Sequence, residues 1–412
     1  MTDEKKAIKA KVESLEKNMV DCLSQCVKIP ALGPTNGGKG ESEKAEYLMG
    51  ALASIGFDEV KRFDVPDDRV PSGTRPNLMA TLKGASKRRL WVISHMDIVP
   101  SGDLAHWSTD PFQPVVKDGK MFGRGTEDNG QDLVASLFAA RALKDSSIIP
   151  EQTLTLLLAA DEETGSDKGI KWLMEKKASL FSKDDLVIVP DAAYPDGSMI
   201  EVAEKSILHL KVRTIGKQVH GSTPGKGINA HHVSAQYIVE VHKALHDGFP
   251  VKDPLFIPPT STFEVTKKEA NIPNINTIPG EDVIYFDNRV LPGYRVDDVL
   301  KVYDGIAEKV SKRTGAKIDV DTVQRDDAAP PTSVNDEITM MTVDCVKEVY
   351  NNKPKCIGIG GGTYAAMFRR NDIPAVVWCK GDEVAHMPNE YCVIKNMVGD
   401  AKVFALMAMT KL

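Results

Sequence analysis

The stretch Thr153-Leu-Thr-Leu-Leu-Leu-Ala-Ala-Asp-Glu-Glu163 joins an apolar segment directly to three acidic residues. Residues 153–159 predict a strand buried on both faces, which is typical of a parallel sheet covered by helices. Open α/β sheets bind ligands beyond the carboxyl ends of their strands, so these acids stand where a functional site is expected. Glu162 and Glu163 are therefore candidate site residues.

Two further apolar segments end in residues of the same kind. His95 and Asp97 follow one of them, and Asp191 follows the other. Helices are expected between the strands, so the two kinds of element alternate along the first half of the chain. This order predicts an α/β fold with a mostly parallel sheet flanked by helices. The strands are expected at 90–93 and 186–189, and the helices at 133–143 and 169–177.

The sequence pattern changes after residue 205. Residues 206–213 alternate apolar and polar side chains, as a half-exposed strand does. We expect a small α+β domain over residues 206–325, which is a usual size for a domain. It would be inserted into the α/β domain, whose two parts are residues 1–205 and 326–412. A chain of 412 residues is also long for a single core.

The overall composition argues against nucleic acid or a membrane as a partner. The chain is 42% hydrophobic and 27% charged, has a net charge of −6, and contains no long basic run. The start of the chain lacks an apolar signal segment, and the apolar runs are too short to span a bilayer. The six cysteines form no C-x-x-C pair, which fits a reducing compartment. We therefore expect a cytoplasmic location.

Acidic residues and histidines without paired thiolates suit a divalent ion such as zinc that must stay reactive. Two adjacent carboxylates repel each other unless a cation or a shared proton intervenes. One of Glu162 and Glu163 could then bind a metal while the other accepts a proton from water. Each residue also has a simpler interpretation: solvated acids for this pair, a helix cap for Asp128 and a turn residue for Asp191.

The order and spacing of the motifs resemble the M20 family of dinuclear metallohydrolases over essentially the whole chain. The resemblance implies a zinc-exopeptidase-like α/β domain with an inserted lid and dimerisation domain. It also implies an enzyme that cleaves amide or peptide bonds with two divalent ions; zinc is expected, and cobalt or manganese would suit the same ligands. The motifs are Ser94-His-Met-Asp97, Gly123-Arg-Gly-Thr-Glu-Asp-Asn-Gly130, Asp161-Glu-Glu163, His220-Gly-Ser-Thr-Pro224, Asn276-Thr-Ile-Pro-Gly280 and His386-Met-Pro-Asn-Glu390.

The resemblance implies a role for each candidate metal ligand. His95 and Asp191 would hold one ion, and Glu163 and His386 would hold the other. Asp128 would lie between the two ions, and the peptide bond that follows it is expected to be cis. Five ligands shared by two ions would leave each ion an open coordination position, as a catalytic site requires.

The resemblance also implies which residues act on the substrate. Glu162 would be the general base, and Asp97 would orient the imidazole of His95. His220 would stabilise the oxyanion, reaching across from the second subunit of a homodimer formed through the inserted domain. The substrate carboxylate would be held by Asn276, Arg289, Gly362 and Thr363.

The sequence leaves two substrate classes open. Asp191 and the segment Gly360-Gly-Gly-Thr-Tyr364 resemble the dipeptidase branch of the family, which favours a small dipeptide with a free carboxylate. The size of the inserted domain resembles the dimeric deacylases, so the alternative is an N-acyl-amino-acid deacylase of the succinyl-diaminopimelate desuccinylase or acetylornithine deacetylase type. A catalytically silent binding protein is disfavoured because all five ligands and Glu162 are present.

Overall fold

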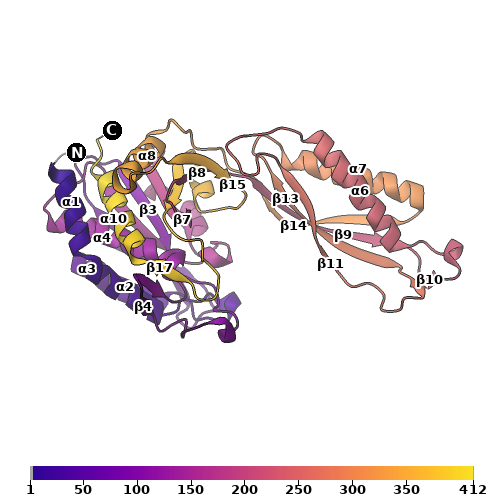
Figure 1. The fold of residues 1–412 in the computed structure, drawn as a ribbon, viewed down its shortest axis with the longest axis horizontal. Coiled ribbons are helices and arrows are strands. Elements are labelled where there is room, and N and C mark those ends of the chain that lie inside the picture. Colours follow the sequence, from indigo (N-terminus) through magenta and orange to yellow (C-terminus); the bar gives the residue numbers. More distant parts are fainter. Residues whose placement is uncertain (1–2, 412) are drawn as a thin grey trace. The chain divides into compact units, whose positions relative to one another are not determined.

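The computed structural model describes residues 3–411, which form two compact units (Figure 1). Unit 1 contains the residues up to Val202 together with Thr332–Cys356 and the residues from Thr363 onward. Unit 2 contains Ala203–Pro331 and the short segment Ile357–Gly362. The limits of 206–325 for an inserted domain stay our prediction from the sequence.

The core of unit 1 is an eight-stranded sheet in the order β1-β2-β6-β3-β7-β16-β8-β15. Its four central strands, from β6 to β16, are parallel, which confirms the predicted α/β class. The pairs β1 with β2, β2 with β6 and β8 with β16 are antiparallel. The strands are β1 (Glu59–Pro66), β2 (Thr74–Leu82), β3 (Arg89–His95), β6 (Thr153–Ala159), β7 (Leu186–Ala193), β8 (Met199–Glu204), β15 (Lys355–Ile359) and β16 (Ala375–Cys379).

Helices cover both faces of this sheet. The α5 and α9 helices pack on the face that carries Trp91 and Ile93, whereas α4, α8 and α10 pack on the other face. This two-sided burial explains the continuous apolar runs of the central strands. The helices are α1 (Asp3–Ser14), α2 (Glu16–Lys28), α3 (Ser42–Ile55), α4 (Gln131–Asp145), α5 (Ile170–Lys176), α8 (Glu337–Tyr350), α9 (Ala365–Arg369) and α10 (Ile394–Ala408).

A second, three-stranded sheet of unit 1 pairs segments that are distant in the sequence. Its order is β17-β5-β4, so β17 (Tyr391–Val393) lies beside β5 (Lys120–Phe122), which also pairs with β4 (Val115–Lys117). Short helical turns connect several strands and helices of the chain. They are η1 (Pro34–Asn36), η2 (Leu104–His106), η3 (Thr126–Gly130), η4 (Glu162–Thr164), η5 (Ala178–Leu180) and η6 (Pro224–Lys226).

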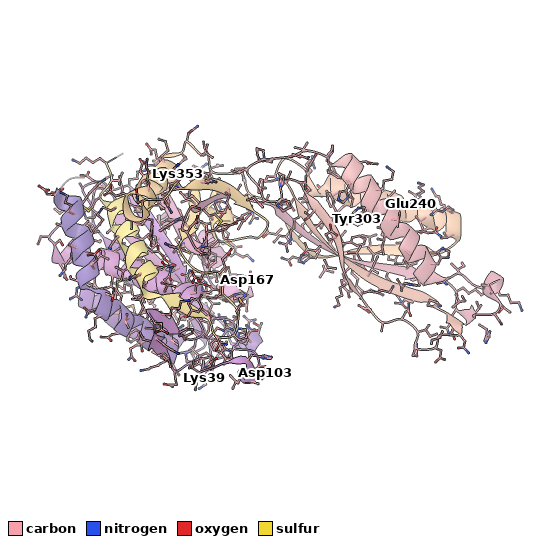
Figure 2. All side chains as sticks on the ribbon, viewed as in Figure 1. Lys39, Asp103, Asp167, Glu240, Tyr303 and Lys353 are labelled. Carbon is pink, nitrogen blue, oxygen red and sulfur yellow. The ribbon has the colours of Figure 1, made fainter. Side chains whose placement is uncertain are left out.

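Unit 2 is an antiparallel sheet in the order β11-β13-β9-β14 with two helices on one face. Buried and less buried residues alternate along β9, as its sequence predicts. Tyr303, labelled in Figure 2, is a buried residue of α7 and donates a hydrogen bond to Asn288 at 2.6 Å. The elements are β9 (Ser206–Ile215), β10 (Val219–His220), α6 (Ala230–Gly248), β11 (Thr262–Lys268), β12 (Thr277–Ile278), β13 (Glu281–Val290), α7 (Val296–Thr314) and β14 (Lys317–Asp326).

None of the helices within residues 3–411 has both the length and the apolar composition that crossing a membrane requires.

Candidate metal centre

The central parallel strands deliver the predicted residues to one edge of the sheet. His95 is the last residue of β3 and lies opposite Ala159, the last residue of β6. Glu162 and Glu163 follow β6 in η4, and Asp191 lies in the last part of β7, the other neighbour of β3. Because the three strands are parallel, their carboxyl ends meet, as expected from the sequence.

Two imidazoles contact different oxygens of one carboxylate in this centre. Asp128 Oδ1 lies 2.9 Å from Nε2 of His95, and Asp128 Oδ2 lies 3.0 Å from Nε2 of His386. His95 Nε2 also lies 3.4 Å from Asp191, and His386 Nε2 lies 3.2 Å from Glu163. The five predicted ligands therefore form two sets of contacts that share Asp128. The peptide bond from Asp128 to Asn129 is cis, which confirms that expectation.

The donor atoms lie close enough together to bind divalent ions. The ligand atoms of His95, Glu162 and Asp191 are within 4.8 Å of one another, and so are those of His95, Asp128 and Glu163. Glu163 Oε1 is buried and makes no hydrogen bond to the described residues. Carboxylate and imidazole donors are those that zinc and similar ions accept, so the residues present fit a metal.

The acids of this centre outnumber the imidazoles, and their pKa values reflect it. Burial and the nearby charge of Asp191 raise the pKa of Glu162 well above its usual range. The contacts with Asp128 and Glu163 raise the pKa of His386 to about 10. Burial opposes the charged form of Asp128, yet His386 and His95 together lower its pKa. Protons compete with metal ions for the same atoms, so a divalent ion would resolve this excess of negative charge.

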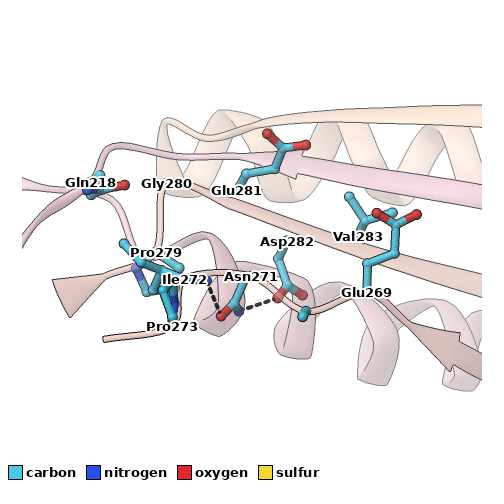
Figure 3. A pocket seen from close by; sticks show the side chains of 11 residues that line it. Gln218, Glu269, Asn271, Ile272, Pro273, Pro279, Gly280, Glu281, Asp282 and Val283 are labelled. Atoms are coloured by element: carbon cyan, nitrogen blue, oxygen red, sulfur yellow. Dashed lines mark hydrogen bonds between the residues drawn. The ribbon is translucent and has the colours of Figure 1, made fainter. Parts of the chain in front are cut away.

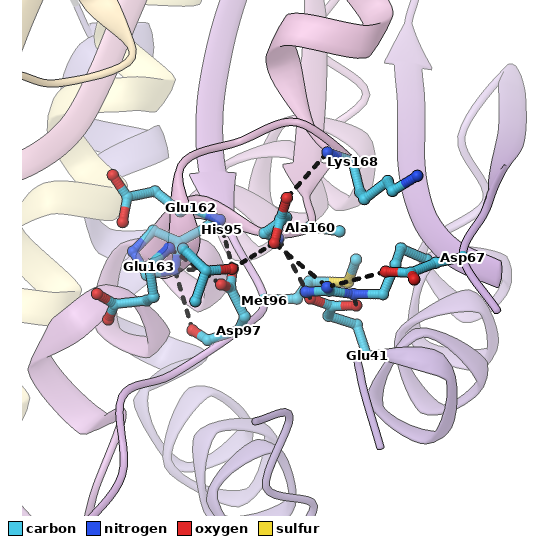
Figure 4. A network of polar contacts seen from close by, with 12 residues as sticks. Glu41, Asp67, His95, Met96, Asp97, Ala160, Glu162, Glu163 and Lys168 are labelled. Atoms are coloured by element: carbon cyan, nitrogen blue, oxygen red, sulfur yellow. Dashed lines mark hydrogen bonds and ion pairs between the residues drawn. The ribbon is translucent and has the colours of Figure 1, made fainter. Parts of the chain in front are cut away.

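Asp97 connects His95 with the turn that carries the two glutamates (Figure 4). His95 Nδ1 lies 3.0 Å from the backbone carbonyl oxygen of Asp97 and 3.6 Å from its carboxylate. That carboxylate accepts hydrogen bonds from the backbone N–H groups of Glu162 at 3.0 Å and Glu163 at 3.1 Å. The sequence suggested only the contact with His95; the structure shows that Asp97 also holds the η4 turn.

A buried ion-pair network lies behind this turn and was not predicted (Figure 4). Arg75 is fully buried and pairs with Glu41 and Asp161. The carboxylate of Asp161 also accepts the backbone N–H of Lys168 at 2.9 Å, while the Asp161 N–H donates to Glu41. One sequence signal pointed this way: Arg75 is the one charged residue of β2, whose other residues are apolar or uncharged. Its partners are distant in the sequence, so they could not be identified.

The predicted residues of unit 2 lie at two places within that unit. The backbone N–H of Gly221 donates to the carbonyl of Asn276, so Asn276 lies beside His220, which is exposed on β10. Arg289 pairs with Ile207 at the other end of β9 and donates a hydrogen bond to the carbonyl of Gly360 at 2.7 Å. The ten residues of β9 span roughly 30 Å. One chain therefore does not bring His220 and Arg289 together within unit 2.

The last two candidate residues, Gly362 and Thr363, follow Gly360 in the chain. Gly362 is the last residue of unit 2, and a side chain at its position would lie 3.8 Å from Asp326. Thr363 begins the last segment of unit 1, and its hydroxyl accepts the N–H of Ala365 at 3.2 Å before α9.

Unit 2 also contains an acidic pocket of about 320 Å³ beside β13 (Figure 3). Glu269, Glu281 and Asp282 line it. Asp282 is buried. Its carboxylate forms an ion pair with Lys268 and accepts a hydrogen bond from the Asn271 amide at 2.9 Å. The charge of Asp282 is therefore balanced by a lysine of the protein, whereas the acids of the metal centre in unit 1 outnumber the imidazoles beside them.

Comparison with known proteins supports one family. Residues 91–410 match the peptidase family M20/M25/M40. An uncharacterized metallohydrolase of Methanocaldococcus jannaschii is 37% identical over 396 residues, covering 92% of this chain and 96% of its own. A probable succinyl-diaminopimelate desuccinylase of Staphylococcus aureus is 28% identical over 358 residues, covering 81% and 86%. The crystal structure of human carnosine dipeptidase 1 shares the fold, with a TM-score of 0.75 at 18% identity over 99% of this chain and 98% of that chain.

Proposed function

We propose that this chain, which belongs to peptidase family M20/M25/M40, hydrolyses small dipeptides that carry a free carboxylate. Membership of the family makes it a metallohydrolase that acts on amide or peptide bonds. The observation that carries the proposal is the arrangement around Asp128, whose two oxygens each contact a different imidazole. A carboxylate placed in this way is suited to bridge two ions.

The proposed metal ligands follow the two sets of contacts. His95 and Asp191 would hold one ion, Glu163 and His386 the other, and Asp128 both. Zinc is proposed, and cobalt or manganese would suit the same donors. When bound, such ions supply Lewis acidity at the substrate carbonyl and lower the pKa of water.

Glu162 is the proposed general base. It lies among the donor atoms of His95 and Asp191, and its backbone is held by Asp97. A carboxylate at this place can accept a proton from water and pass it to the leaving amine. Asp97 supports this role because it positions both the base and the imidazole of His95.

The proposed active form is a homodimer. Because His220 and Arg289 lie at opposite ends of β9, a substrate that contacts both requires His220 from a second subunit. Asn276 would then belong to the same partner-derived group as His220. Arg289, with Gly362 and Thr363, would bind the substrate carboxylate, for which a guanidinium is well suited.

An N-acyl-amino-acid deacylase is the second candidate. It is favoured by the 28% identity to the probable succinyl-diaminopimelate desuccinylase.

The predicted cytoplasmic location rests on the cysteine content and stays a prediction.

The test is hydrolysis of a small panel by zinc-loaded protein, with chelator-treated protein as the control. The panel contains free dipeptides, N-acetyl and N-succinyl amino acids, and dipeptides with a blocked N-terminus. Chelator-sensitive cleavage of free dipeptides alone is expected. Cleavage of the acylated compounds alone would replace the dipeptidase with the deacylase, and no turnover of any compound would favour a silent binding protein.

A further inference from the structure

The two segments that carry Asp128 and His386 start from paired strands. Phe122 at the end of β5 lies opposite Tyr391 at the start of β17. Beyond this pair, the backbone N–H of Gly123 donates to the carbonyl of Glu390 at 2.9 Å. The segment 380–390 forms no helix or strand. Other contacts must therefore hold His386 near Asp128.

The carboxylate of Glu390 makes such contacts with the segment before α4. It is fully buried and accepts the backbone N–H groups of Gly125 at 3.1 Å, Glu127 at 2.9 Å and Asp128 at 3.1 Å. Arg124 donates to the same carboxylate at 2.7 Å and reaches the carbonyl of His386 at 3.3 Å. Glu390 thus binds the backbone of Asp128 directly, and that of His386 through one arginine.

The carboxylate of Glu127 makes the reciprocal contacts. It accepts the backbone N–H groups of Asp382 and Val384, each at 2.6 Å, from the segment that leads to His386. A Cβ atom at Gly381 would lie 2.5 Å from Glu127 Oε1, so only glycine leaves room for this carboxylate. Each segment therefore contributes one glutamate whose carboxylate accepts hydrogen bonds from the backbone of the other segment.

We propose that Glu127 and Glu390 are positioning residues that form a carboxylate clasp, and that this clasp sets the affinity for the ion held by Asp128 and His386. The inference rests on the proposed function, because it presupposes that these two residues bind a metal. His386 has a side chain that is 57% exposed and a backbone φ of 64°, whereas the His95 side chain is 1% exposed at a strand end. The exposed histidine depends on its loop for position, and the clasp holds that loop.

The substitutions Glu390→Gln and Glu127→Gln keep the shape of each side chain but weaken the clasp. In each variant the NH₂ group of the glutamine replaces a carboxylate oxygen and faces a backbone N–H group. Both groups are donors, so the hydrogen bonds to that oxygen are lost. Loss of outer contacts of metal ligands typically lowers metal affinity by about 10- to 100-fold. Glu127 is less buried than Glu390 and binds fewer groups, so its substitution should have the smaller effect.

The matched control is Glu201→Gln. Glu201 is also fully buried and pairs with a buried arginine, Arg369, at 2.8 Å, but it lies on β8, which carries none of the proposed ligands. This variant should lower the thermal unfolding midpoint while zinc affinity stays unchanged. It thus separates general destabilisation from a specific effect on the metal.

The experiment measures zinc affinity by competition with a chelator, together with the visible absorption of the cobalt-substituted protein. Glu390→Gln should weaken one of the two bound ions by about 10- to 100-fold and change the cobalt spectrum, with a smaller loss for Glu127→Gln. Wild-type zinc affinity in both variants, or an equal loss in Glu201→Gln, would overturn the clasp. If Glu390→Gln does not fold, Glu127→Gln decides. If the wild-type protein binds no zinc, the proposed function itself fails and the clasp with it.

Discussion

Unit 1 contains two groups of neighbouring acids whose negative charges repel each other, one partly buried and one fully buried. At the edge of the sheet, Asp128 and its neighbouring acids meet two imidazoles. Between α4 and α10, Asp132 lies beside Asp400, which accepts hydrogen bonds from the neutral groups of Tyr350 at 2.7 Å and Gln131 at 2.9 Å. The charge of Lys380 partly offsets the effect of burial on the pKa of Asp400. Burial, chiefly, raises the pKa of Asp400 to about 7 and that of Asp132 well above its usual range.

The position of each group in the fold determines what balances its negative charge. The inner pair lies on α4 and α10, where burial and the mutual repulsion of the two acids favour a shared proton. The outer group stands at the carboxyl ends of parallel strands, where ligands reach an α/β sheet. We therefore interpret the outer group as a cation site and the inner pair as structural.

The largest effect is expected for Asp128→Asn. This change removes the charge of the carboxylate that both imidazoles contact, so both ions should bind poorly. Loss of metal catalysis removes several kcal/mol of transition-state stabilisation, so turnover should fall at least about a thousandfold. Turnover and zinc content of the purified variant check this. If the variant binds two ions and turns over near the wild-type rate, the acids at the sheet edge would not differ in role from the inner pair.

The next effect is expected for Glu162→Ala. A general base typically increases the reaction rate by about 10²- to 10⁴-fold. Turnover should therefore fall by at least about a hundredfold, while both ions stay bound. Kinetics and metal analysis of the same sample make the test. A variant that loses an ion instead would show that the roles of Glu162 and Glu163 have been exchanged.

A smaller loss is expected for His220→Ala. Removing one oxyanion donor costs about 10²- to 10³-fold in turnover, and zinc content should not change. Mixing His220→Ala with Arg289→Ala tests the shared site, because a mixed dimer regains one complete site. About a quarter of wild-type activity should return after subunit exchange. Wild-type activity of His220→Ala alone, or no recovery on mixing, would argue that each chain works by itself.

The smallest effect is expected for Asp132→Asn in the inner pair. The pKa values of both acids are raised in the folded protein, so their protonated forms stabilise it below about pH 4. This stabilisation is lost as the pH rises through the raised pKa values, of which that of Asp400 is about 7. Asparagine keeps a donor toward Asp400 and cannot ionise. The difference between the unfolding midpoints at pH 5 and pH 8 should therefore shrink. A loss of zinc or turnover in this variant would mean that the inner pair also serves the metal centre.

The part of the site that the sequence predicts is the part encoded by local runs. Apolar segments that end in His95, Glu162 and Asp191 mark strand ends, and parallel strands bring those ends together. The lone His386 follows no such segment, and only the family resemblance suggested its role. The antiparallel direction of the outer strands was not predicted either, because an apolar run does not reveal the direction of its neighbour.

The supporting contacts could not be predicted because they join distant residues. Glu41 and Arg75 are 34 residues apart and Arg124 and Glu390 are 266 apart, so each pair is brought together by the tertiary fold. Likewise, the family resemblance grouped Asn276 with Arg289, whereas the register of β9 and β13 separates them within unit 2. Pairing of buried charges is a property of the assembled core rather than of any segment.

The most direct test of the cation site is the number of zinc ions bound per chain, measured by elemental analysis after dialysis of the wild-type protein against trace zinc. Two ions per chain are predicted for the wild type and for Asp132→Asn, and fewer for Asp128→Asn. A wild-type protein that binds no zinc, or an Asp128→Asn variant that retains both ions, would contradict the assignment of the strand-end acids to a dinuclear metal centre.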